Sequence, residues 1–381
     1  MSINTVADAS PAAAPTVRAG ARRSTQILLA LGATLAGCLA ASAALGLALP
    51  RADAAATGTL LTGVGLVSAG VLLVVAGRLL VRATRGWWRL VLLPWLLVVL
   101  VAVYALSIAL AAVYSPRPPA GRIPPEAVAV SMTSADGVSL AGWYLSSRNG
   151  ASVVLRHGAG SRASDTEAQA LALHEAGFGV LATDARGHGA SGGQSMDLGW
   201  HGEADIDAAI EFLSGRDGVD DARIAVVGLS MGGEEAIGAA GADDRICAVV
   251  AEGATGRTAG DKSWLAQEYG VAGVVQGWLD AVTYGLIDLL AQKRTPPTLA
   301  ESIQAAEGTP FLLVAAGEVP DEALVAQRLQ QIDPDRVTIW VADGAQHTAA
   351  IRTSPGEWSS RVVGFLETAF GRCGAERAGT A

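Results

Sequence analysis

Three long apolar runs in the first third of the chain constrain its fold more than any other feature. They cover residues 27–49, 60–81 and 90–113. A helix needs about 20 apolar residues to cross a bilayer, whereas a strand of a soluble sheet has about 4–8. The runs therefore predict three transmembrane helices within residues 25–115. A cleaved signal peptide is the alternative for the first run, but such peptides have apolar stretches of only about 7–15 residues.

Small residues recur inside the first two runs. Gly32 and Gly37 lie in the first run, and Gly63 and Gly70 lie in the second. Such residues let the backbones of membrane helices approach closely, which agrees with the prediction of spanning helices.

The arginines of this region predict its orientation. Residues 1–116 carry eight arginines, of which all but Arg51 lie before the first run or near the link between the second and third runs. Since positively charged loops stay in the cytoplasm, the N terminus is expected inside and the part after the third helix outside, in an extracytoplasmic position. We expect residues 1–24 to be a disordered cytoplasmic tail and the proline-rich residues 116–125 to be a stiff linker.

Composition limits the classes of function. Only 17% of the 381 residues are charged, below the roughly 25% of a soluble domain. The net charge of −9 combines +6 over residues 1–116 with −15 over the remainder, and an acidic remainder argues against nucleic-acid binding. Three scattered cysteines exclude a disulfide framework, no spacing indicates zinc, and Cys247 is interpreted as a small core residue.

From Glu126 onward, short apolar runs alternate with helical stretches, which predicts an α/β domain with a mostly parallel sheet covered on both faces. This domain is expected over residues 126–372, with a tail over 373–381. The alternation stops at about 253–308, where an inserted helical segment is expected. The expected strands lie at 128–132, 138–144, 152–156, 179–183, 223–227, 247–251, 311–315 and 337–341, and the expected helices at 165–176, 203–214, 231–240, 322–332 and 357–370.

A Gly-x-Ser-x-Gly motif is the strongest chemical signal. The segment Gly228-Leu229-Ser230-Met231-Gly232 follows an expected strand and opens an expected helix. This is the context of a nucleophile elbow, where glycines avoid collisions in a cramped turn that lifts the serine hydroxyl out of the sheet. Ser230 is therefore the candidate nucleophile, and the Met231 N–H at the helix start is a candidate donor to an oxyanion.

Two further loops follow expected strands. The segment His157-Gly158-Ala159-Gly160 is a glycine-rich loop that could supply the second oxyanion donor from Ala159, with His157 as a structural residue. The segment 184–191 is by itself an ordinary polar turn.

The ordered set His-Gly-Ala-Gly, Asp-x-Arg-Gly-His-Gly-x-Ser and Gly-x-Ser-x-Gly-Gly resembles the α/β-hydrolase superfamily, in particular serine hydrolases of the dienelactone hydrolase and serine aminopeptidase-like groups. The resemblance covers about residues 126–372 and leaves the three apolar runs outside. It implies an α/β-hydrolase fold in which Asp184 to His188 form a structural turn beside the active site. Arg186 and His188 are therefore not assigned to the catalytic set.

The fold's catalytic partners follow in the order nucleophile, acid, histidine. Of the five histidines only His347 follows the elbow, so it is the candidate general base. The acid is expected after the strand at 311–315, where Pro320 stands at the position that usually carries aspartate in the family. Asp321 is preferred as the acid, and Glu318 and then Glu322 are the alternatives.

These features predict a membrane-anchored serine hydrolase that cleaves an ester, thioester or amide through an acyl-enzyme on Ser230. Esterase chemistry is preferred to peptidase chemistry because the inserted segment is apolar. The expected partners are a small-molecule ester or amide, lipidic ones included, and the lipid bilayer, and no metal or organic cofactor is implied. A catalytically silent hydrolase-fold binding module in the membrane is the alternative.

Two interpretations concern the surroundings of the site. The inserted segment is preferred as a lid over an acyl pocket, with packing on the membrane surface and plain core as alternatives. Glu252 follows an expected strand and is interpreted as capping a loop rather than lining the site.

Overall fold

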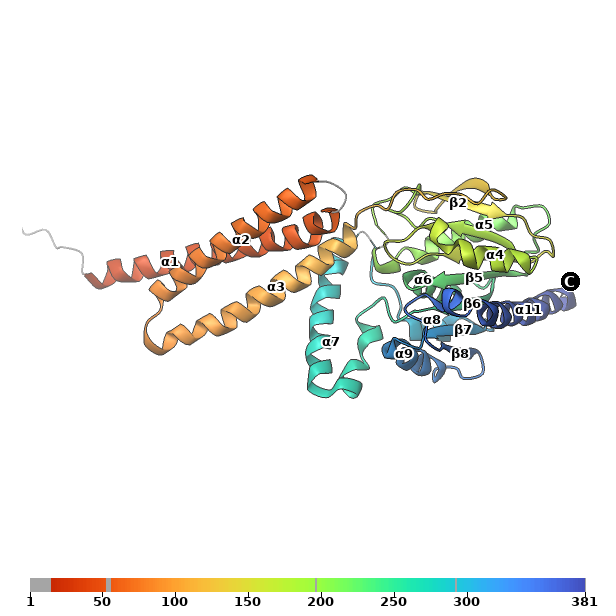
Figure 1. Ribbon diagram of the computed structural model, residues 1–381. Helices are drawn as coiled ribbons and strands as arrows, with labels where there is room; N and C mark the ends of the chain where they lie inside the picture. Colours follow the sequence, from red (N-terminus) through yellow and green to blue (C-terminus); the bar gives the residue numbers. More distant parts are fainter. Residues whose placement is uncertain (1–14, 53–55, 196, 292, 381) are drawn as a thin grey trace, which may run out of the picture. The chain divides into compact units, whose positions relative to one another are not determined.

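A computed structural model describes residues 15–52, 56–195, 197–291 and 293–380. The chain divides into two compact units, residues 1–108 and 109–381. The first unit consists of long helices and the second of a sheet with helices around it (Figure 1).

The three apolar runs form helices. These are α1 (Pro15–Ala43), α2 (Ala56–Ala83) and α3 (Leu92–Val113), whose last turn belongs to the second unit. Helix α1 is followed by a π-helical turn at Ala44–Ala48 and a 3-10 turn at Leu49–Arg51. A 3-10 turn at Gly86–Val91 precedes α3. By length and composition the stretches Arg22–Arg51, Thr57–Ala83 and Gly86–Val113 could each cross a membrane.

Small residues permit close contacts between α1 and α2 at two positions. A Cβ atom on Gly37 would lie 2.8 Å from Leu73 Cγ, so α1 and α2 approach closely there because Gly37 has no side chain. Gly65 lies in the same way against Ala44, just after α1. Gly32, Gly63 and Gly70 have no neighbour within 4 Å of a Cβ position.

The second unit contains a sheet of eight strands in the order β1-β2-β4-β3-β5-β6-β7-β8. The pairs β1–β2 and β2–β4 are antiparallel and the others are parallel. The mostly parallel sheet predicted from the sequence is therefore confirmed. The strands are β1 (Val128–Thr133), β2 (Ser139–Leu145), β3 (Ser152–Arg156), β4 (Gly179–Thr183), β5 (Ile224–Leu229), β6 (Ile246–Glu252), β7 (Phe311–Ala316) and β8 (Val337–Ala342).

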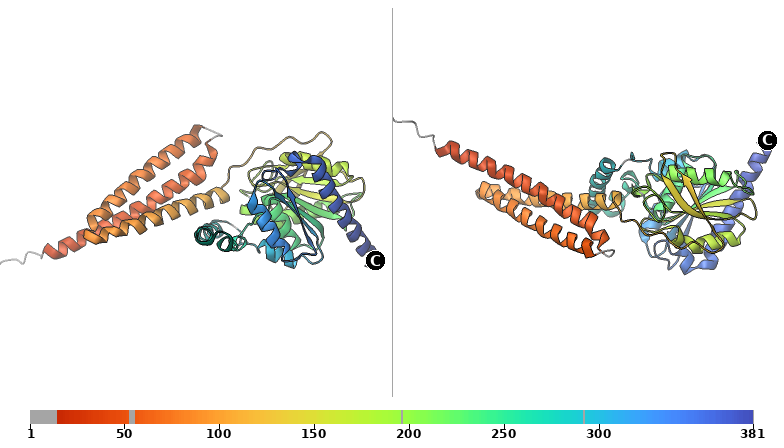
Figure 2. Two further views of the ribbon diagram at one scale, coloured as in Figure 1. Left: turned by 60° about the horizontal axis from the view of Figure 1, so that its bottom comes forward. Right: turned by 90° about the horizontal axis from the view of Figure 1, so that it is seen from above.

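Helices cover both faces of this sheet (Figure 2). Alternate strand residues enter two hydrophobic clusters: Val154 belongs to the cluster with α5, α6, α8 and α9, whereas Val153 belongs to the cluster with α4, α10 and α11. Covering both faces explains why the central strands are apolar throughout. The helices are α4 (Glu167–Glu175), α5 (Gly202–Ser214), α6 (Met231–Ala240), α7 (Leu265–Leu290), α8 (Leu299–Ala305), α9 (Pro320–Gln330), α10 (Ala350–Thr353) and α11 (Pro355–Thr380), with 3-10 turns at Ala163–Thr166, Asp197–Gly199 and Gly260–Lys262.

The segment between β6 and β7 is a helical insertion. It contains α7 and α8, and α7 bends at Gly270, whose φ of 55° and ψ of −128° are not helical. Residues 116–124 of the expected linker lie in no helix or strand, and they are part of the second unit, in which Arg117 donates to the Gly193 carbonyl at 2.7 Å.

The structure corrects both expected tails. Helix α1 begins at Pro15, so residues 15–24 are helical rather than disordered, whereas residues 1–14 of that expected tail lie outside the described residues. At the other end α11 continues to Thr380, through most of the tail expected over 373–381.

A disulfide joins Cys247 to Cys373, with a Cα–Cα distance of 6.1 Å. The sequence excluded a disulfide framework but did not indicate this single disulfide, and Cys247, which is buried in the core as interpreted, is also one of its two partners. The two cysteines are 126 residues apart, and they meet because α11 packs back across β6 in the folded domain. Such a pairing depends on tertiary structure and leaves no trace in the spacing.

Candidate active site

The tight turn between β5 and α6 presents Ser230. Its φ of 53° and ψ of −122° are sparsely populated for a residue with a side chain. A Cβ on Gly228 would lie 2.1 Å from the Gly232 carbonyl oxygen, and a Cβ on Gly232 would lie 2.6 Å from the His157 carbonyl oxygen. Only glycine fits at these two positions, as the motif predicts.

His347 meets this serine from another part of the sheet. It lies in the loop between β8 and α10, and its Nε2 is 2.8 Å from Ser230 Oγ. The histidine side chain is 48% exposed, so it borders solvent on one side. The structure thus brings together the predicted nucleophile and the predicted base.

The third member is Glu322, which corrects the choice of acid. Glu322 Oε1 lies 2.6 Å from His347 Nδ1, and Oε2 accepts the Ala316 N–H at 2.7 Å. The preferred candidate Asp321 instead accepts a hydrogen bond from Tyr269 Oη at 2.5 Å, and the first alternative, Glu318, is exposed.

The helix start explains this difference. Helix α9 begins at Pro320 rather than at the expected Glu322. Adjacent helical residues point about 100° apart, so one turn of helix directs Asp321 and Glu322 to different sides. Glu322 is 2% exposed and points to the histidine, whereas Asp321 points to the insertion.

The carboxylate also shifts the pKa of the histidine. The hydrogen bond that His347 Nδ1 donates to Glu322 favours the imidazolium and raises the pKa of His347 above its usual value, although partial burial acts in the opposite direction. Because the other carboxylate oxygen accepts a backbone N–H, both oxygens of Glu322 have donors.

Two amide groups, those of Met231 and Ala159, are the predicted oxyanion donors. Met231 is the first residue of α6, and Ala159 lies in the glycine-rich loop after β3. Within the described part of the chain, neither N–H donates to a protein acceptor. Ala159 and Ser230 line one cavity of about 220 Å³. Its other lining residues are Gly158, Ser161, Asp165, Ala168, Gln169, Leu229, His347, Thr348, Ile351 and Arg352.

Two buried histidines brace the loop that holds Ala159. His157 Nε2 accepts the Ala185 N–H at 2.9 Å, and His188 Nε2 accepts the Gly160 N–H at 3.1 Å. Burial lowers the pKa of His157 to about 3 and also lowers that of His188, so both rings stay neutral and can accept these bonds.

The polar turn at 184–191 is held from within the domain. Asp184 accepts the Ala163 N–H at 2.8 Å and the Ala190 N–H at 2.9 Å, and Arg186 pairs with Asp205 and Asp136. None of these groups lines the cavity at Ser230. This placement agrees with the expectation that Arg186 and His188 stay outside the catalytic set.

Glu252, interpreted from the sequence as capping a loop rather than lining the site, supports the site without lining its cavity. It is buried at the end of β6, where its side chain accepts the Ala350 N–H at 3.0 Å and the Trp358 Nε1–H at 3.2 Å. Its backbone carbonyl accepts the Ser230 N–H at 2.6 Å. Glu252 therefore ties the elbow to the segment after His347, and a single carboxylate after a strand gave no signal of these contacts.

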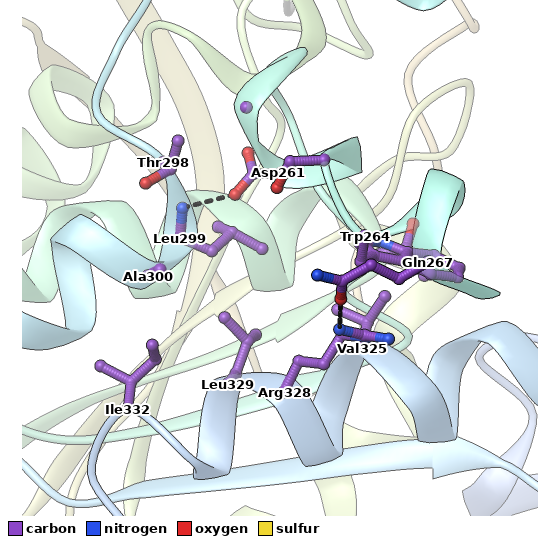
Figure 3. A pocket seen from close by; sticks show the side chains of 13 residues that line it. Asp261, Trp264, Gln267, Thr298, Leu299, Ala300, Val325, Arg328, Leu329 and Ile332 are labelled. Carbon is purple, nitrogen blue, oxygen red and sulfur yellow. Dashed lines mark hydrogen bonds between the residues drawn. The ribbon is translucent and has the colours of Figure 1, made fainter. Parts of the chain in front are cut away.

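A second cavity, of about 340 Å³, lies away from Ser230 between the start of α7, α8 and α9 (Figure 3). Leu299, Val325 and Leu329 provide its apolar floor, and Arg328 donates to Gln267 at its rim (Figure 3). Among the described residues, no group of three or more His, Cys, Asp or Glu side chains could hold a metal ion.

Comparison with known proteins agrees with this geometry. Residues 147–295 match the family model described as serine aminopeptidase, S33. The structure is similar to the esterase Pf2001 of Pyrococcus furiosus, with a TM-score of 0.51 and 25% identity over 67% of this chain and 99% of that one. It also shares its fold with the α/β hydrolase GrgF of Penicillium sp. sh18, with a TM-score of 0.50 and 17% identity over 65% of this chain and 100% of that one.

Curated relatives cover less of the chain. An uncharacterized protein of Mycobacterium tuberculosis, known from two strains, is 40% identical over 129 residues, which are 33% of this chain and 45% of that protein. The match thus spans less than half of the relative's length. Together with the sheet order and the elbow, these similarities show that the second unit has the α/β-hydrolase fold.

Proposed function

We propose that this α/β-hydrolase domain is a membrane-anchored serine hydrolase that cleaves an ester, thioester or amide through an acyl-enzyme on Ser230. The observation that carries the proposal is the continuous hydrogen-bonded series from Ser230 Oγ through His347 to the buried Glu322, with distances of 2.8 and 2.6 Å. A serine held in a strained turn beside a base and a buried carboxylate fits nucleophilic catalysis.

The mechanism follows from these positions. Ser230 Oγ attacks the substrate's carbonyl carbon while His347 Nε2 takes the hydroxyl proton, and Glu322 stabilises the resulting imidazolium without being protonated itself. The oxyanion receives the Met231 and Ala159 N–H groups. His347 then protonates the leaving alcohol, thiol or amine. A water molecule, deprotonated by His347, attacks the acyl-enzyme, and as the acid leaves, His347 returns that proton to Ser230 Oγ.

Esterase chemistry with a short acyl group is the preferred form of this activity. The 220 Å³ cavity at Ser230 is smaller than the roughly 300–1,000 Å³ of pockets for drug-sized ligands. The inserted segment contributes none of the lining residues of this cavity, so the structure does not support the predicted lid over an acyl pocket. The esterase named among the similar structures also favours this choice.

The domain is proposed to lie outside the cytoplasm. The arginine distribution places the N terminus inside and the end of the third span outside. The disulfide between Cys247 and Cys373 supports the same side, since disulfides persist in oxidising compartments. Protease added to intact spheroplasts should therefore digest the domain after Arg117, and full protection of the domain would place it in the cytoplasm.

Labelling with a fluorophosphonate tests the serine mechanism. The wild-type protein should be labelled, and Ser230→Ala should lose both the label and the hydrolysis of p-nitrophenyl esters. Ser161→Ala is the matched control, because Ser161 lines the same cavity but donates to Asp165. Activity of Ser230→Ala equal to that of the wild type would reject the proposal, and a series of esters of increasing chain length would define the acyl group.

A further inference from the structure

Helix α7, labelled in Figure 1, bends at Gly270. The part after the bend exposes an apolar face. Five large side chains on it are between 54% and 82% exposed. They are Val271, Val274, Val275, Trp278 and Leu289. Soluble monomers rarely expose a contiguous apolar patch of this kind without a partner for it.

The sequence of α7 gathers these residues on one side. Positions 271, 274, 275, 278, 282 and 289 recur at spacings of three, four and seven residues, which share one face of a helix, and all are apolar. Gln276 donates to Asp280 on a different side, and the buried Thr283 and Ile287 point to the domain. Asp288 is exposed at the edge of the apolar face, where it accepts hydrogen bonds from Thr295. The apolar face of α7 is thus opposite to the face that packs on the domain.

The buried side of α7 indicates what covers the apolar face. Within the second unit, Ile287 packs in one cluster with Trp200 and with Ala109 and Val113, the last residues of α3. The stretch Gly86–Val113 is the third candidate membrane span, so Val113 is where the chain leaves its apolar segment. The C-terminal end of α7 therefore contacts the residues that stand at the edge of the proposed membrane.

We propose that residues 271–290 of α7 lie along the membrane surface, with the face of Val271, Val274 and Trp278 inserted into the same bilayer that holds α1 to α3. An amphipathic helix lies in this way at the boundary between headgroups and acyl chains, where tryptophan is favoured. The inference rests on the membrane anchorage proposed above but not on the hydrolase chemistry. It assigns the inserted segment to membrane contact rather than to a lid.

Spin-label accessibility in the full chain tests this inference. In a Cys38→Ala background, Val274→Cys is labelled with a nitroxide and the protein is placed in phosphatidylcholine–phosphatidylglycerol nanodiscs, with the Cys247–Cys373 disulfide intact. Val128→Cys is the matched control, because Val128 is 64% exposed on the edge strand β1 and Val274 is 59% exposed. Val67→Cys on α2 reports the proposed span.

Oxygen concentrates in the acyl chains, and a nickel chelate stays in water. We expect the ratio of oxygen to nickel accessibility at position 274 to exceed that at position 128 at least about fivefold, since helices of this type insert about 5–10 Å. Equal ratios at positions 274 and 128 would show that the face meets water, and shielding from both reagents would indicate a second protein copy. Either result overturns the inference.

The same experiment separates the inference from the proposed function. A water-like signal at position 67 would overturn both the anchorage and the membrane contact of α7. If fluorophosphonate did not label the wild-type protein, that result would reject only the hydrolase chemistry.

Discussion

The substitution Glu322→Gln distinguishes the acid identified by the structure from the acid preferred by the sequence. The two oxygens of Glu322 each accept a hydrogen bond, one from His347 Nδ1 at 2.6 Å and one from the Ala316 N–H at 2.7 Å. A glutamine has one accepting oxygen and a donating NH₂ group. It can therefore satisfy only one of the two donors, and the other is left buried without an acceptor.

The expected loss is large because Asp321 and Glu252, two carboxylates near the site, already accept hydrogen bonds from other groups. Asp321 accepts from Tyr269, and Glu252 accepts from Ala350 and Trp358. Loss of the acid lowers kcat about 10⁴-fold in a Ser-His-Asp protease, which corresponds to about 5.5 kcal/mol. We expect Glu322→Gln to lower kcat at least about 10³-fold on a p-nitrophenyl ester.

The control is Asp321→Asn, which changes the adjacent carboxylate. Asp321 accepts a hydrogen bond from the half-exposed Tyr269 rather than from His347, so kcat of Asp321→Asn should stay within about threefold of the wild type. Both variants need thermal unfolding curves, because loss of the Glu322 contacts also destabilises the loop that holds His347. If Asp321→Asn were the inactive variant and Glu322→Gln kept nearly full activity, the assignment from the structure would be refuted.

Three further predictions follow from the site and its support. Since Glu322 raises the pKa of His347, the acid limb of kcat/KM should lie above pH ~6.5 in the wild type and move to lower pH in Glu322→Gln; an unmoved limb in pH–rate profiles would contradict this. Gly228→Ala should prevent folding, measured by circular dichroism, because its Cβ would lie 2.1 Å from a carbonyl oxygen, whereas Gly364→Ala, with open space in α11, should fold normally. Cys373→Ser should lower the free energy of unfolding by about 2–5 kcal/mol in denaturant titrations. Reductant should not destabilise this variant further, and if reductant lowered its free energy of unfolding by an equal amount, the disulfide would not be the cause.

The sequence by itself predicted most of the elements and two of the residues that the structure brings together, Ser230 and His347. The strands were predicted within a few residues, and so were most helices except for the start of α1 and the end of α11, because apolar periodicity reflects which faces are buried. Ser230 was found because the elbow needs glycines at 228 and 232, a requirement of local backbone geometry. His347 was found by chain order, since it is the one histidine after the elbow. These signals depend on local sequence or on the order of residues along the chain, and both can be read from the sequence.

Only the tertiary structure decided the features that depend on direction and on distant partners. The acid was mistaken because Asp321 and Glu322 are adjacent, and the start of α9 at Pro320 decides which one points to His347. The disulfide and the contacts of Glu252 join residues about 100 or more positions apart. The outward apolar face of α7 was hidden for the same reason: a sequence shows that a helix is amphipathic, but only packing shows which side the domain covers.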